Sequence, residues 1–224
     1  MQLNLYEQFL LLSLDKVKGK FLIDSLTLNY GLAGALLLQL SKDEIIRIDS
    51  KKLYLEKLNL TENKILDDCI NLIRASKKQR SAKYWVNRIG SKAGLIRNQV
   101  LSQLCEKQIV KIEKSKFLWV FTITRYPSVN SDIVDQIKKQ LIDIVINYRK
   151  PELESVLLLS LVNGCKLTRA FFPAKADYKK ANARIKELTK EIEIGEAVSQ
   201  TIKEIQAAVI IASTSAVVAA SASH

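Results

Sequence analysis

The chain has 224 residues, of which 48% are hydrophobic, enough to fill the core of one globular domain. It has only 7 glycines and 3 prolines, which leaves little room for a disordered linker. Its net charge of +12 is typical of proteins with an anionic partner, either nucleic acid or a lipid surface, although a Lys-rich composition without such a partner is the alternative. The single histidine is the last residue, His224, which excludes a Ser-His-Asp triad, a Cys-His pair and a histidine metal site.

Other signs of catalysis are missing as well. The sequence contains neither a G-x-x-x-x-G-K-[ST] loop nor a G-x-G-x-x-G motif, so nucleotide binding has no motif to support it. Cys69, Cys105 and Cys165 lie too far apart for a Cys-x-x-Cys metal site, and we expect them to be reduced core residues. The N-terminal residues have no basic leader before their apolar run and no signal-peptide cleavage site. We therefore expect a cytoplasmic protein that is not an enzyme and holds no metal or cofactor.

The apolar pattern predicts a mainly α-helical single domain over residues 1–224, in which amphipathic helices surround central apolar helices. Residues 5–14 and 30–40 are apolar around most of their circumference, which is typical of core helices, and Gly31 and Gly34 would let another element approach closely. Alternating residues on both sides of Ser50 predict a first β-hairpin.

The middle of the chain predicts a helix, a basic loop and a second helix followed by a hairpin. A helix over 61–73 begins behind Thr61 as its cap, and residues 76–83 form a solvated basic loop. The helix that contains Arg97 precedes strands at 109–113 and 117–123, with a basic turn between them.

The last third predicts helices again. Residues 130–150 repeat apolar side chains at helical spacing, Pro151 starts a second helix that Gly164 can end, and 176–192 alternate charge along a surface helix. Residues 205–223 carry no charge, but Ala, Ser and Thr dominate them, which favours a closely packed helix inside the protein over a membrane anchor.

The predicted second hairpin permits several functions. A helix followed by a hairpin is the order of a winged-helix nucleic-acid reader, in which Arg97, Asn98 and Gln99 would enter the major groove while Lys114 and Lys116 met phosphate. Its apolar residues Leu118, Trp119 and Val120 could instead pack in the core, join two copies of the chain or enter a membrane. We favour core packing with a protein–protein contact over a membrane wedge or a DNA wing.

Several segments in order resemble the Golgi phosphoprotein 3 family. These are LNLYEQFLLLSL, YGLAGALLLQL, the LCEKQIV helix end before FLWVF, LLLSLVNGCKLTRAFFPAKADYKKANARIKEL and the terminal EIQAAVIIASTSAVVAA. The resemblance implies a helical domain that binds membranes peripherally. Eukaryotic members of the family recognise phosphatidylinositol 4-phosphate on Golgi membranes and bind the cytosolic tails of glycosyltransferases.

The resemblance also implies a lipid site. The family pocket combines a tryptophan and an arginine near the first core helix with two arginines three residues apart. Asp24 stands at the tryptophan position, Ala33 at the first arginine, and Gly94 and Arg97 at the pair, so only Arg97 is retained. This degraded pocket is in keeping with a short, bacterial-type member of the family.

We therefore predict a peripheral membrane adaptor whose basic surface binds anionic lipid head groups through Arg97, Lys92 and Arg88. It would lie in the cytoplasm on membranes, on the cytosolic face of the Golgi in a eukaryotic host. Further expected partners are a second copy of the chain and the cytosolic tails of membrane proteins. A winged-helix nucleic-acid binder is the alternative function, and a scaffold that oligomerises through the hairpin is a third.

Overall fold

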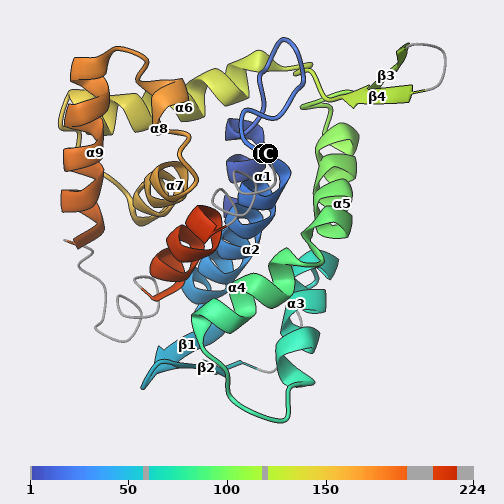
Figure 1. Ribbon diagram of the computed structural model, residues 1–224, viewed down its shortest axis with the longest axis vertical. Coiled ribbons are helices and arrows are strands. Elements are labelled where there is room, and N and C mark those ends of the chain that lie inside the picture. The colour runs from blue at the N-terminus through green and yellow to red at the C-terminus, as the bar shows by residue number, and fades with distance from the viewer. Residues whose placement is uncertain (1, 58–60, 118–120, 191–203, 216–224) are drawn as a thin grey trace.

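The computed structural model describes residues 2–57, 61–117, 121–190 and 204–215. Figure 1 shows a mainly α-helical single domain, as predicted. The helices are α1 (Leu5–Leu12), α2 (Ser25–Lys42), α3 (Lys64–Arg74), α4 (Ala82–Gly90), α5 (Ala93–Glu106), α6 (Ser131–Ile146), α7 (Leu153–Gly164), α8 (Thr168–Phe171), α9 (Lys175–Lys190) and a last helix over 204–215. The strands are β1 (Ile46–Asp49), β2 (Lys52–Leu55), β3 (Glu113–Phe117) and β4 (Phe121–Arg125).

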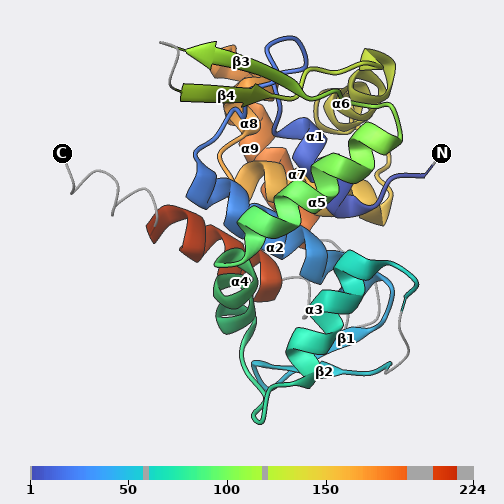
Figure 2. The ribbon, with the colours of Figure 1, turned by 90° about the vertical axis from the view of Figure 1, so that its right-hand side faces the viewer.

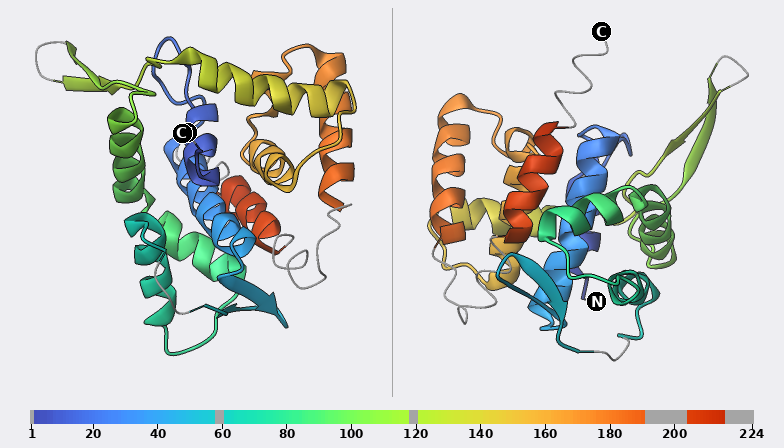
Figure 3. Two further views of the ribbon diagram at one scale, coloured as in Figure 1. Left: turned by 180° about the vertical axis from the view of Figure 1, so that it is seen from behind. Right: turned by 60° about the horizontal axis from the view of Figure 1, so that its bottom comes forward.

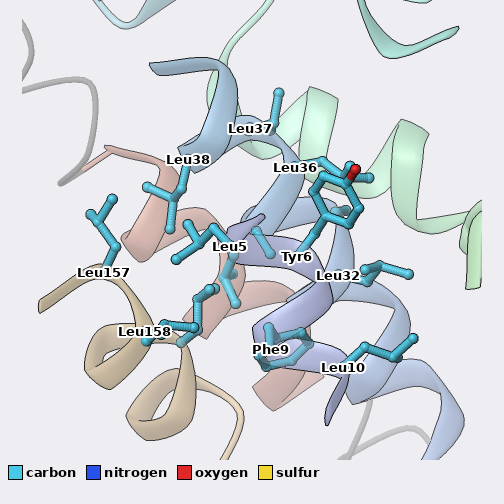
Figure 4. Close-up of a cluster of buried hydrophobic side chains, with 14 of the residues drawn as sticks. Leu5, Tyr6, Phe9, Leu10, Leu32, Leu36, Leu37, Leu38, Leu157 and Leu158 are labelled. Atoms are coloured by element: carbon cyan, nitrogen blue, oxygen red, sulfur yellow. The ribbon is translucent and has the colours of Figure 1, made fainter. Parts of the chain in front are cut away.

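Helix α2 runs through the centre of the domain, and α1, α4, α5 and α7 pack around it. Figure 4 shows leucines of α1, α2 and α7 meeting beside Tyr6 and Phe9. Every residue from 31 to 41 is buried, because α2 has no polar stripe and must be covered on all sides. The prediction of central apolar helices is confirmed.

Both glycines of α2 sit where another element approaches. A Cβ on Gly31 would overlap the Phe9 ring and lie 2.6 Å from the Cys165 sulfur, and a Cβ on Gly34 would overlap Cγ2 of Val209 in the last helix. The last helix buries Ile205, Ala208, Val209, Ala212 and Ser213 against the core, while Ala207 and Ile210 on its other side are exposed. It therefore packs on the domain, as the small-residue composition predicted. No helix in the described ranges combines the length and the apolarity that crossing a bilayer requires.

The first hairpin forms as predicted, with β1 antiparallel to β2 and both Ser50 and Lys51 at positive φ in its turn. The predicted cap of α3 was wrong. Asn63, rather than Thr61, accepts hydrogen bonds from the amides of Ile65 and Leu66, while Thr61 donates its own amide and hydroxyl hydrogens to Asp67.

The second hairpin differs from the prediction. Residues 113–116 form most of strand β3 instead of a turn, and β3 pairs antiparallel with β4 in a register that runs from Glu113–Arg125 to Phe117–Phe121. The hairpin projects from the body of the domain (Figure 3), and residues 113–116 are exposed. Leu118, Trp119 and Val120 lie outside the described residues.

One buried ion pair joins the start of α1 to the end of α5. Glu7 is fully buried, and its Oε1 lies 2.6 Å from the Lys107 ammonium, which remains 30% exposed. The other oxygen, Oε2, accepts the Asn4 amide hydrogen at 2.9 Å and completes a capping box. This pair ties together two helices that are a hundred residues apart in sequence.

The three cysteines occupy different environments. Burial raises the pKa of the Cys69 and Cys165 thiols to about 12, so both stay protonated and unreactive at neutral pH. Cys105 is only partly buried, although burial raises the pKa of its thiol as well.

Candidate lipid-binding face

A tight loop before α2 packs against the base of the second hairpin. The Asp15 carboxylate accepts the amide hydrogens of Val17 and Lys18, and the hydrogen bond from Lys18 is the main reason that the pKa of Asp15 is lowered. Gly19 then turns at a φ of +61°, and its carbonyl accepts the Tyr126 amide hydrogen at 2.9 Å. A Cβ at Gly19 would collide with the backbone of Tyr126, so the contact requires glycine.

Arg97 lies where this loop, the hairpin base and α5 converge. Its guanidinium carbon is 5.5 Å from the centroid of the Phe21 ring, and that ring is 6.3 Å from the ring of Tyr126. Within the described chain, no carboxylate lies within ion-pair distance of Arg97. The aromatic contact holds a half-buried guanidinium in place while its charge remains available to an anion.

Arg88 and Lys92 lie together at the junction of α4 and α5, apart from the aromatic contact of Arg97. Arg88 is in the last turn of α4, and Lys92 occupies the N-cap position of α5 without a side-chain cap hydrogen bond. Both side chains are exposed. The junction is fixed to α2, because Gly90 packs so closely on Tyr30 that a Cβ would lie 2.7 Å from the ring. Figure 2 shows α4 and α5 in front of α2, with the hairpin above.

The three predicted cations belong to a longer basic segment of the chain, which extends the predicted basic loop 76–83 in both directions. Between Asp68 and Glu106 the chain carries eight basic residues and no acidic one. They follow the chain from the end of α3 through α4 into α5, and we call them the basic flank: Arg74, Lys77, Lys78, Arg80, Lys83, Arg88, Lys92 and Arg97. Counting acidic residues across the predicted loop and its neighbouring helices would have revealed this segment.

Exposed leucines accompany the basic flank. Leu95 is 74% exposed and follows Lys92 by three residues at the start of α5, while Leu22, 40% exposed, is next to Phe21, the ring that contacts Arg97. Leu26 in the first turn of α2 is 48% exposed. A surface that offers apolar side chains between cations can contact both the head groups and the upper acyl region of a bilayer.

Sequence reasoning also missed Arg125. This residue ends β4 at the base of the hairpin and is half-buried, and its Nε is buried with no hydrogen-bond partner in the described structure. Its position next to Tyr126 places a second arginine near the convergence of the loop, the hairpin and α5. No sequence pattern distinguished Arg125 from the other basic residues of the strands.

The remaining positions of the aligned pocket have other structural roles. Asp24 caps α2 by accepting the amide hydrogens of Leu26 and Thr27. Burial alone would raise the pKa of this carboxyl, but these hydrogen bonds outweigh it and hold the pKa below its usual value. Ala33 is fully buried in α2, where a charged side chain has no space. Gly94, in contrast, faces open space, since a Cβ there meets no atom within 4 Å.

Two comparisons with known proteins match most of this chain. The family model described as Golgi phosphoprotein 3 (GPP34) matches residues 5–205. The vacuolar protein sorting-associated protein 74 of Schizosaccharomyces pombe (strain 972 / ATCC 24843) is 26% identical over 164 residues, which are 64% of this chain and 48% of that protein. The chain thus spans about half the length of the curated relative that it matches.

Proposed function

The chain belongs to the Golgi phosphoprotein 3 family, and from this premise we propose that it is a non-enzymatic peripheral membrane adaptor that binds anionic bilayers through the basic flank. The observation that carries the proposal is the unbroken basic segment on α3 to α5, whose described exposed neighbours include Leu22, Leu26 and Leu95. Each basic residue near an anionic bilayer contributes about 1 kcal/mol of attraction, so several of them suffice for reversible binding.

Arg97 is the proposed phosphate contact within this surface. An arginine can bind a phosphate with two parallel hydrogen bonds, and the contact with Phe21 restricts the guanidinium before the lipid arrives. Arg88 and Lys92 at the nearby helix junction supply further positive charge without a fixed geometry. Arg125 is a second arginine that could assist at the hairpin base.

Lipid selectivity is expected to be weak. Only one of the four aligned pocket positions, Arg97, carries the family's residue, since Asp24 caps α2, Ala33 is buried in the core and Gly94 has no side chain. Several converging cations are normally needed to distinguish a head group with an extra phosphate. We therefore expect the protein to prefer anionic over neutral bilayers, with little additional affinity for bilayers that contain phosphatidylinositol 4-phosphate.

The adaptor role requires a partner besides the lipid. The proposed partners are the cytosolic tails of membrane proteins and a second copy of the chain, the latter through the projecting hairpin with Leu118, Trp119 and Val120. In a eukaryotic host, this function would place the protein on the cytosolic face of the Golgi.

The proposal is tested by co-sedimentation with neutral vesicles, vesicles containing phosphatidylserine and vesicles containing phosphatidylinositol 4-phosphate, at low and at physiological salt. We expect binding to both anionic sets that weakens with salt, because the screening length falls from about 30 Å at 0.01 M to about 8 Å at 0.15 M. Arg97→Gln should weaken binding several-fold, whereas Lys180→Gln on the distant helix α9 removes the same charge with little effect. Failure to bind any vesicle would refute the lipid function, and tight binding to duplex DNA instead would favour the nucleic-acid alternative.

A gain of affinity is expected from Gly94→Arg. The position is open and lies three residues before Arg97 on α5, so the new guanidinium can approach the same lipid phosphate. We expect about tenfold tighter binding to vesicles with phosphatidylinositol 4-phosphate, a change that corresponds to about 1.4 kcal/mol, and a smaller gain for phosphatidylserine. Gly94→Gln is the neutral control of similar length. Equal affinities of the two variants would show that Arg97 and position 94 do not share a phosphate.

A further inference from the structure

A second basic site lies on the far side of the molecule from the basic flank. A surface pocket of about 310 Å³ lies at the junction of α8 and α9, lined by Arg169, Pro173, Lys175, Tyr178 and Lys179. Figure 1 shows α9 and α5 at opposite sides of the domain, and Figure 3 shows the same separation from behind. A bilayer in contact with α5 would therefore not reach this pocket.

The fold fixes the pocket walls. Phe171 and Phe172 at the end of α8 are buried, and the chain turns from there into α9 through exposed Pro173. Helix α9 then begins, and the Tyr178 amide donates to the Ala174 carbonyl in its first turn. Arg169 reaches the pocket from α8, whereas Lys175, Tyr178 and Lys179 come from neighbouring positions on one face of α9.

The cations of the pocket have no internal counter-charge. No carboxylate in the described ranges forms an ion pair with Arg169, Lys175 or Lys179. Asp177 does not line the pocket, since it stands two residues from each lysine and so on another face of the helix. Like charges four residues apart repel each other, and the positive end of the α9 dipole adds to the same potential.

We infer that this pocket binds the phosphate group of a phosphate ester. The Arg169 guanidinium can hold two phosphate oxygens, the two ammonium groups can neutralise the dianion, and the Tyr178 hydroxyl can donate one further hydrogen bond. The volume is larger than a phosphate alone needs, and Pro173 with the Tyr178 ring offers an apolar wall for the organic part of the ester. This inference is independent of lipid binding by the basic flank.

The test is a titration of the ¹⁵N-labelled protein with phenyl phosphate and with inorganic phosphate, followed by amide chemical shifts. We expect saturable shifts confined to the residues around α8 and the first two turns of α9. Lys175→Gln/Lys179→Gln should weaken binding at least tenfold. Lys180→Gln/Lys186→Gln removes the same charge from exposed positions of α9 outside the pocket and should leave the affinity unchanged.

The inference would be overturned if both double variants lost the same amount of affinity for phenyl phosphate. It would also be overturned if the amide shifts spread over all lysine-containing segments and did not saturate, because that result indicates only non-specific attraction of anions. The source of the phosphate is distinguished by vesicle binding of the same variants. If vesicles with phosphatidylserine bind both double variants equally, the ligand is a soluble ester, whereas a selective loss in Lys175→Gln/Lys179→Gln assigns the phosphate to a lipid head group.

Discussion

Lys107→Ala is expected to lower the free energy of unfolding by about 3–5 kcal/mol, because it leaves the Glu7 carboxylate buried without its counter-ion. The partner is 2.6 Å away in the native protein, and no other cation forms an ion pair with Glu7 in the described structure. Denaturation by urea, followed by circular dichroism, measures the loss. The effect is large because the deleted charge is half of a pair whose acidic partner is fully buried.

The same account predicts a rescue. Glu7→Gln in the Lys107→Ala background removes the stranded charge, while the amide oxygen of the new side chain can still accept the Asn4 amide hydrogen. The double variant should therefore be clearly more stable than Lys107→Ala alone. Lys111→Ala is the matched control, because the Lys111–Glu113 pair is more than half exposed on both sides and should contribute only about 0–1 kcal/mol. A Lys107→Ala variant as stable as this control would contradict the role given to the buried pair.

Gly34→Ala is expected to lower the free energy of unfolding by about 1–3 kcal/mol, although alanine favours a helix more than glycine does. The reason is the overlap between the new Cβ and Cγ2 of Val209, which is 1% exposed and cannot move away without displacing the last helix. Gly94→Ala makes the same chemical change in open space on α5, and there we expect no loss or a small gain in stability.

A double-mutant cycle with Val209→Ala identifies the contact. Val209→Ala alone should destabilise the protein, because it removes buried apolar surface. In combination with Gly34→Ala, the space left by the two valine methyl groups accommodates the new Cβ at position 34. We therefore expect a favourable coupling of about 1–2 kcal/mol. Strictly additive effects would show that the last helix does not pack on α2 at this point.

The central helices and the last helix were predictable because their sequences have few packing solutions. A helix as uniformly apolar as residues 30–40 has to be central, and glycines at Gly31 and Gly34 indicated close approach before the partners Phe9 and Val209 were known. The strands of the second hairpin were misplaced, because the hydrophobic run after Lys116 reads as a strand, while pairing places the polar segment 113–116 in β3. Register depends on the partner strand, which local sequence does not specify.

The candidate site was only partly predictable. The sequence identified Arg97, Lys92 and Arg88 as basic residues near one helix, but their separation into a helix junction and an aromatic contact depends on Tyr30 and Phe21, which are distant in sequence. The buried Glu7–Lys107 pair was missed for the same reason, since its two residues are a hundred positions apart. The pocket at α8 and α9 is local in sequence, and it was missed because the turn between the two helices is set by the burial of Phe171 and Phe172.

The most direct test of the proposed membrane-binding face is the fluorescence of an environment-sensitive dye at position 95. Cys105→Ser removes the partly exposed thiol, Cys69 and Cys165 are buried with thiol pKa values of about 12, and Leu95→Cys then supplies one reactive site for the label. We predict a blue shift and a brighter emission on addition of vesicles with phosphatidylserine, reversed by high salt, and no change for the same dye at Lys186→Cys on α9. An unchanged spectrum at position 95, or an equal change at both positions, would contradict the basic flank as the surface that meets the bilayer.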